Sequence, residues 1–91
     1  MIRVALTGAL GRMGRAVHDG LVETGEFEFP LLLDVVEDAD NVYQGRLKSD
    51  PGLIQPGCAD VLLDLTVAAV ACDHIRRAIK AGMPAVVGTQ P

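Results

Sequence analysis

The sequence is poor in several residue types, and each shortage excludes a class of protein. Only 3% of its 91 residues are aromatic, and Cys58 and Cys72 are its two cysteines. Two cysteines are too few for a disulfide framework, and neither has the spacing or the neighbouring histidines of a zinc site. We therefore expect two reduced thiols that pack as small apolar side chains, and no bound metal.

Long apolar runs and excess basic charge are also missing. No stretch approaches the roughly 18 apolar residues of a membrane span, and the run that starts at Ile2 is too short for a signal peptide. Eight basic and twelve acidic residues give a net charge of -4, which provides no basic surface for nucleic acid or anionic lipid. We expect a cytoplasmic protein with no nucleic-acid or membrane partner.

The apolar residues form a pattern of alternating strands and helices. Hydrophobic residues make up 49% of the chain, and this length has room for one domain. The pattern predicts strands over 2–7, 29–33, 61–65 and 85–87, a helix over 12–24, and a second helix marked by Ala71, Ile75, Ala78 and Ile79. Residues 36–60 show no sustained period, with one helical turn expected at Pro51. We predict an α/β fold: a Rossmann-like parallel sheet of about four strands with helices on both faces.

A glycine-rich turn follows the first predicted strand. Gly8, Gly11 and Gly14 form a G-x-x-G-x-x-G variant of the dinucleotide fingerprint, in which backbone N–H groups and the helix dipole face a pyrophosphate. Asp34 lies 20 residues after Gly14 at the end of the second strand, where a carboxylate would bind the adenine ribose. A ligand-free turn and a solvated loop acid are the alternatives, but together the two features favour nucleotide binding.

The residues around Asp34 predict which nicotinamide dinucleotide is bound. Residues 34–45 include four carboxylates and no basic side chain, so a ribose 2′-phosphate would meet repulsion there. We predict a preference for NADH, with NADPH as the alternative because Arg12 and Arg15 could reach over the ribose. Comparable or tighter binding of NADPH would refute this preference.

We assign no catalytic residue. His18 and His74 are expected to be surface or partly packed helix residues, and neither cysteine has a histidine placed as its base. Asp64, at the end of a buried strand, is expected to play a structural role as an acceptor of backbone N–H bonds.

Three motifs in order resemble the dihydrodipicolinate reductase family of bacteria, also called 4-hydroxy-tetrahydrodipicolinate reductases. They are the opening run with Gly11-Arg12-Met13-Gly14, the strand end Asp64-Leu65-Thr66, and the segment from Ala81 to Thr89. The resemblance implies a reductase of lysine and diaminopimelate biosynthesis that passes hydride from NAD(P)H to an unsaturated cyclic dicarboxylate. It further implies that the pyrophosphate is bound by Gly8, Gly11, Arg12 and Met13, the adenine ribose by Asp34, and the nicotinamide end by Thr66, Gly88 and Thr89.

The substrate domain of that family would follow residue 91. We therefore expect residues 1–91 to be a dinucleotide-binding domain truncated at its C-terminal end, inactive alone, and marginally stable or self-associating because of an uncovered apolar edge. A stand-alone, non-catalytic dinucleotide-binding module is the alternative. Homoserine and aspartate dehydrogenases open with similar units, but the Gly-Arg-Met-Gly core argues against them.

Overall fold

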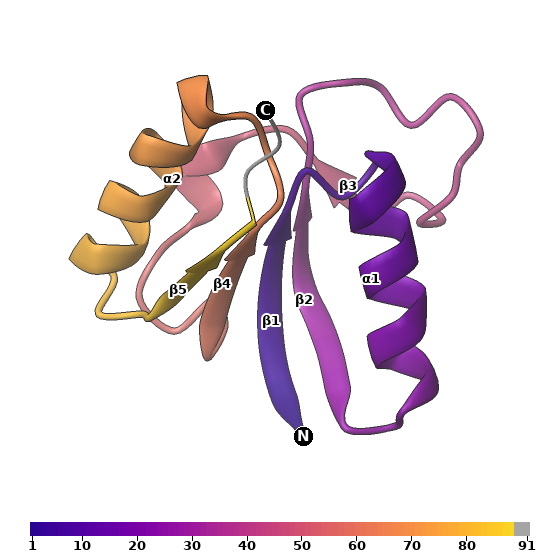
Figure 1. Ribbon diagram of the computed structural model, residues 1–91, viewed down its shortest axis with the longest axis horizontal. Helices are drawn as coiled ribbons and strands as arrows, with labels where there is room; N and C mark the ends of the chain where they lie inside the picture. Colours follow the sequence, from indigo (N-terminus) through magenta and orange to yellow (C-terminus); the bar gives the residue numbers. More distant parts are fainter. Residues whose placement is uncertain (89–91) are drawn as a thin grey trace.

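The computed structural model describes residues 1–88, which form a five-stranded parallel sheet and two α-helices. The elements in chain order are β1 (Ile2–Thr7), α1 (Arg12–Glu23), β2 (Phe27–Leu33), β3 (Leu47–Lys48), the short 3-10 helix η1 (Pro51–Leu53), β4 (Val61–Asp64), α2 (Ala68–Lys80) and β5 (Ala85–Val87). The strand order is β3-β2-β1-β4-β5. From β1, the chain adds β2 and β3 on one side and then β4 and β5 on the other, so the order in which strands are added reverses between β1 and β4. The carboxyl ends of all five strands therefore share one edge (Figure 1).

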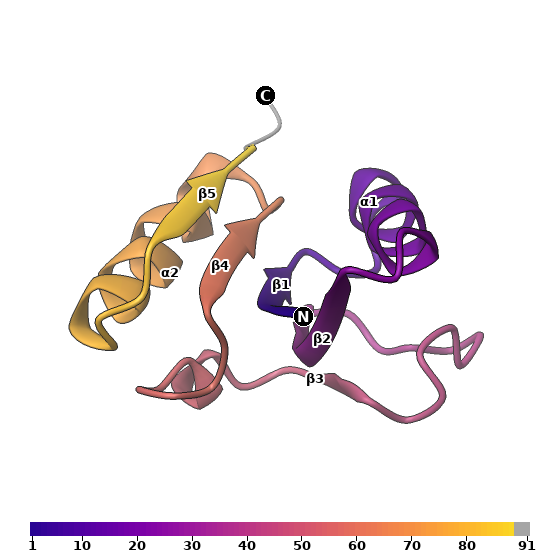
Figure 2. The ribbon, with the colours of Figure 1, turned by 90° about the horizontal axis from the view of Figure 1, so that it is seen from below.

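The two α-helices cover opposite faces of the sheet. Figure 2 shows α1 on one side and α2 on the other, with η1 on the α2 side. One apolar cluster, which includes Leu6, Phe29 and Leu32, lies on the α1 face, and a second, which includes Leu62 and Ala78, lies on the α2 face. Because β1 is central, its last four residues are buried on both faces, as its continuous apolar sequence predicts.

The predicted fold class is confirmed, but the sheet has five strands in place of about four. The additional strand, β3, pairs with β2 only through Leu47 and Lys48. Two residues are too few to produce a period in the sequence. β2 also begins at Phe27, two residues earlier than expected, and Pro30 falls where its register with β1 shifts, as suits a residue without an N–H.

Some apolar residues of the two helices do not pack against the sheet. Met13 and Ala16 are exposed, because α1 approaches the sheet through Gly14 and the half-buried Val17. Ile79 is 69% exposed on α2. Cys58 packs against the core as expected, whereas Cys72 is exposed.

Candidate dinucleotide-binding site

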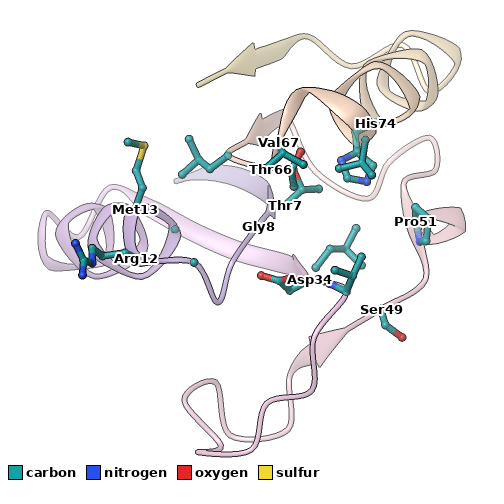
Figure 3. A pocket seen from close by; sticks show the side chains of 16 residues that line it. Thr7, Gly8, Arg12, Met13, Asp34, Ser49, Pro51, Thr66, Val67 and His74 are labelled. Atoms are coloured by element: carbon teal, nitrogen blue, oxygen red, sulfur yellow. Dashed lines mark hydrogen bonds between the residues drawn. The ribbon is translucent and has the colours of Figure 1, made fainter. Parts of the chain in front are cut away.

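A pocket of about 470 Å³ lies at the carboxyl edge of the sheet. Its walls come from the β1–α1 turn, the end of β2, the segment around η1, and the β4–α2 connection. Figure 3 shows Arg12 and Met13 on one side, Thr66, Val67 and His74 on a second, and Ser49 and Pro51 on a third. Open α/β sheets bind ligands at this edge, where the chain direction reverses.

Two glycines allow the backbone to pass through the narrowest part of the β1–α1 turn. Gly8 has φ +76°, and a Cβ atom there would lie 2.7 Å from the carbonyl oxygen of Leu65. A Cβ atom at Gly14 would lie 2.1 Å from the carbonyl oxygen of Gly8. Both distances are well inside van der Waals contact, so the close approach of α1, the turn and the β4–α2 connection requires glycine at both positions.

Gly11 is different, because the protein itself does not require glycine there. It has φ -65°, and a Cβ atom would make only an ordinary contact of 3.4 Å. Gly11 is the N-cap of α1, provides no side-chain cap, and lines the pocket beside Arg12. The first turn of α1 holds no acidic residue, so no carboxylate of the helix itself offsets the positive end of its dipole at the pocket.

Asp34 faces the same turn from the end of β2. Its carboxylate accepts hydrogen bonds from the backbone N–H of Leu10 at 2.9 Å and of Val35 at 2.7 Å. These bonds fix the carboxylate against the glycine turn, while Asp34 still lines the pocket. A carboxylate has about four acceptor sites, so it retains capacity for a ligand hydroxyl.

Tyr43 holds the glycine turn from the opposite side. Its buried hydroxyl donates to the carbonyl of Ala9 at 2.6 Å, and the His18 ring lies 4.7 Å from Phe29 and 4.9 Å from Tyr43, centroid to centroid. Burial, and then the nearby Asp19 carboxylate, raise the pKa of the Tyr43 phenol, so it remains a donor at neutral pH. No local pattern predicts this contact, because 34 residues separate the partners.

Asp64 is fully buried at the end of β4, and its Oδ1 atom accepts several hydrogen bonds. Its Oδ1 accepts from the hydroxyls of Thr7 at 2.5 Å and Thr66 at 2.6 Å, and lies 3.3 Å from Nδ1 of His74. Its Oδ2 is buried and has no hydrogen-bond partner among residues 1–88. Burial acts to raise the pKa of this carboxyl, but hydrogen bonds from Thr66, Thr7 and His74 outweigh it and hold the pKa below its usual value.

The structure brings most of the sequence-predicted site residues together. Six of the eight line the pocket: Gly8, Gly11, Arg12, Met13, Asp34 and Thr66. Gly88 follows β5 at the same edge but does not line the pocket, and Thr89 lies outside the described residues.

The Thr66 hydroxyl donates a hydrogen bond to Asp64, and the next residue, Val67, is the N-cap of α2. Two expectations about polar residues need correction. His74, expected to be a surface or partly packed residue, is buried and lines the pocket. Asp64 has the expected structural setting but accepts short hydrogen bonds from hydroxyls, whereas the backbone N–H of Thr66 lies farther away, at 3.3 Å. Buried partners on separate elements produce these contacts, so spacing in the sequence could not reveal them.

Comparison with known proteins identifies the family of this site. The family model described as dihydrodipicolinate reductase, N-terminus, matches residues 2–90. The chain belongs to this family. Within residues 1–88, no group of side chains is arranged to hold a metal ion, and no helix is long and apolar enough to cross a membrane.

Relatives of the chain carry the same description. It is 34% identical over 99 residues to the 4-hydroxy-tetrahydrodipicolinate reductase of Moorella thermoacetica, covering 97% of this chain and 36% of the relative. It is 31% identical over 111 residues to the enzyme of that name from Methanothermobacter thermautotrophicus, covering 98% of this chain and 38% of the relative. The chain thus spans little more than a third of these relatives. The matches support the family prediction and do not favour the stand-alone module.

A solved structure supports the fold. The chain matches a dipicolinate-bound dihydrodipicolinate reductase from Paenisporosarcina sp. TG-14 with a TM-score of 0.72 and 24% identity, over 99% of this chain and 38% of that one. At this identity the match confirms the α/β architecture.

Proposed function

We propose that this chain is the NAD(P)H-binding part of a dihydrodipicolinate reductase, which passes hydride to an unsaturated cyclic dicarboxylate in lysine and diaminopimelate biosynthesis. One observation carries the proposal: in a chain of this family, the glycine turn and Asp34 face the same pocket at the point where the sheet reverses direction. This combination is the general arrangement for dinucleotide binding in open α/β sheets.

The residues of the pocket fit each part of a nicotinamide dinucleotide. The pyrophosphate would lie over the start of α1, where Gly11 permits close approach and Arg12 adds positive charge. Asp34 would accept hydrogen bonds from the adenine ribose, and Thr66 with Gly88 and Thr89 would form the nicotinamide end. When bound, the cofactor supplies the hydride. The chain's part is to bind and orient it, so we expect binding without turnover by these 91 residues.

Calorimetric titration with NADH tests the proposal. Asp34→Ala should weaken binding at least about tenfold, because it removes a charge-assisted hydrogen bond. It also removes the acceptor of the Leu10 N–H, so Asp34→Asn, which keeps a carbonyl oxygen, separates ribose binding from support of the turn. Asp40→Ala is the matched control, because Asp40 is an exposed acid of the same loop and does not line the pocket. No binding by the wild-type chain, or equal losses at Asp34 and Asp40, would contradict the proposal.

We further propose that NADH binds more tightly than NADPH. Asp34, Glu37 and Asp38 line a second hollow of about 360 Å³ beside the main pocket, so a 2′-phosphate there would meet several carboxylates. Lys48 lines the same hollow. The count of charged side chains over residues 34–45 did not include it, because it lies just beyond residue 45. Titrations of both cofactors at fixed ionic strength, with wild type and Lys48→Gln, test this preference. Tighter binding of NADPH, lost in Lys48→Gln, would overturn the preference and assign the phosphate to Lys48.

A further inference from the structure

The Asp64 cluster has a hydrogen-bond arrangement that the proposed site does not yet use. Its three polar partners come from three elements: Thr7 from β1, Thr66 from the β4–α2 connection and His74 from α2. All three line the pocket, whereas Asp64 does not (Figure 3). The carboxylate therefore lies behind the pocket wall and contacts the side chains that form it.

Each partner has a fixed number of protons to donate. A threonine hydroxyl has one proton, and short bonds to Asp64 Oδ1 occupy the protons of Thr7 and Thr66. A carboxylate only accepts, so Nδ1 of His74 must carry the ring proton in its contact with Oδ1. Once these protons face Asp64, both hydroxyl oxygens retain only lone pairs, and a His74 ring whose single proton is on Nδ1 has an acceptor at Nε2.

We propose that Asp64 is a positioning residue that makes this wall of the pocket a hydrogen-bond acceptor, through Thr66 and His74, for an N–H or O–H donor of the bound dinucleotide. The inference rests on the proposed cofactor function and adds a specificity element to it. Two groups at the nicotinamide end have the required chemistry: the carboxamide N–H₂ and the ribose hydroxyls. A ligand that presents only an acceptor at this wall would meet lone pairs and lose affinity.

The polarity of the wall can be measured without a ligand. Long-range ¹H–¹⁵N spectra of the 91-residue chain should be recorded at a pH at which they show a neutral His74 ring. We expect this ring to be protonated at Nδ1 and unprotonated at Nε2. The chain has two histidines, so a His18→Gln variant assigns the signals. A His74 ring protonated at Nε2 would overturn the inference whether or not a dinucleotide binds.

Binding experiments test what the wall recognises. Thr66→Val keeps the shape but removes the hydroxyl, and we expect about tenfold weaker NADH binding; Thr66→Ser keeps the hydroxyl and should lose less than about threefold. Melting temperatures of both variants check that the chain is folded. An equal loss in the two variants, or a change below threefold in Thr66→Val, would overturn the inference.

Two further ligands identify the donor. The reduced 3-acetylpyridine analogue of NADH lacks the amide N–H₂, and ADP-ribose lacks the nicotinamide but keeps the ribose hydroxyls. If the amide is the donor, Thr66→Val leaves binding of the analogue unchanged; if a ribose hydroxyl is the donor, Thr66→Val weakens both ligands about tenfold. A wild-type chain that binds none of these ligands would contradict the proposed function itself, while the tautomer of His74 still decides the polarity of the wall.

Discussion

At the residue scale, the polar contacts of the site join side chains that are far apart in the sequence. Thr7 and Asp64 are separated by 57 residues, and Tyr43 reaches back 34 residues to Ala9. A buried polar group that loses its partner costs more than the bond itself contributes, because its desolvation is no longer compensated. Such residues therefore support stability and hold the pocket wall at the same time.

Replacing Asp64 tests how much one buried, hydrogen-bonded carboxylate contributes to the stability of the chain. Its pKa is lowered in the folded chain, so its contribution to stability is complete above the unfolded value of about 3.9 and is lost as the pH falls through the folded value. Asp64→Asn should reduce the free energy of unfolding at pH 7 by about 1–3 kcal/mol. Its stability should also fall less than that of wild type between pH 5 and pH 2. Urea unfolding across this range measures both effects, with the exposed Asp40→Asn as control.

At the element scale, α1 packs against the glycine turn through backbone. The helix buries only Gly14, and its first turn begins directly at the pocket. The chain offers two glycines in one helix with opposite surroundings: Gly14 against the carbonyl of Gly8, and Gly20 with nothing within 4 Å of its missing Cβ.

The two alanine substitutions should therefore have opposite effects. Gly14→Ala forces a Cβ into fixed backbone and should lower the free energy of unfolding by about 3 kcal/mol or more. Gly20→Ala removes backbone freedom from the unfolded chain and should raise it by about 0.5–1 kcal/mol. Chemical denaturation of both variants is the measurement. A Gly14→Ala chain as stable as wild type would contradict the packing described for the turn.

At the scale of the whole molecule, β5 is an edge strand of the sheet with exposed apolar side chains. Within residues 1–88, no strand pairs with the outer edge of β5, and Val86 and Val87 on that strand are 57% and 42% exposed. Ile79 on the neighbouring α2 is 69% exposed. An open strand edge beside apolar side chains promotes pairing between chains.

We therefore expect the chain to associate as its concentration rises. Sedimentation velocity should show a mass that increases with concentration, and Val86→Lys should reduce this increase because a charged edge disfavours pairing. Val22→Lys, at a 46% exposed position on α1, is the matched control and should leave the association unchanged. A wild-type chain that stays monomeric throughout the concentration series would show that the edge is already protected.

Much of the fold was predictable because it depends on local patterns. The strand bounds Ile2–Thr7 and Ala85–Val87 agree with the structure, since apolar runs bounded by glycine or proline are local signals. The G-x-x-G-x-x-G spacing and Asp34 were also sufficient to place the pocket, because carboxyl ends of parallel strands meet at one edge.

The sequence by itself determined four of the five strands and both α-helices in their chain order, the glycine turn and the family motifs, because these depend on neighbours along the chain. Only the tertiary structure decided that β3 joins the sheet, that Tyr43 reaches Ala9, and that His74 turns inward to Asp64. Those outcomes depend on which buried donor lies beside which acceptor after the elements pack. The electrostatic character of the pocket wall follows from that packing, and no spacing in the sequence specifies it.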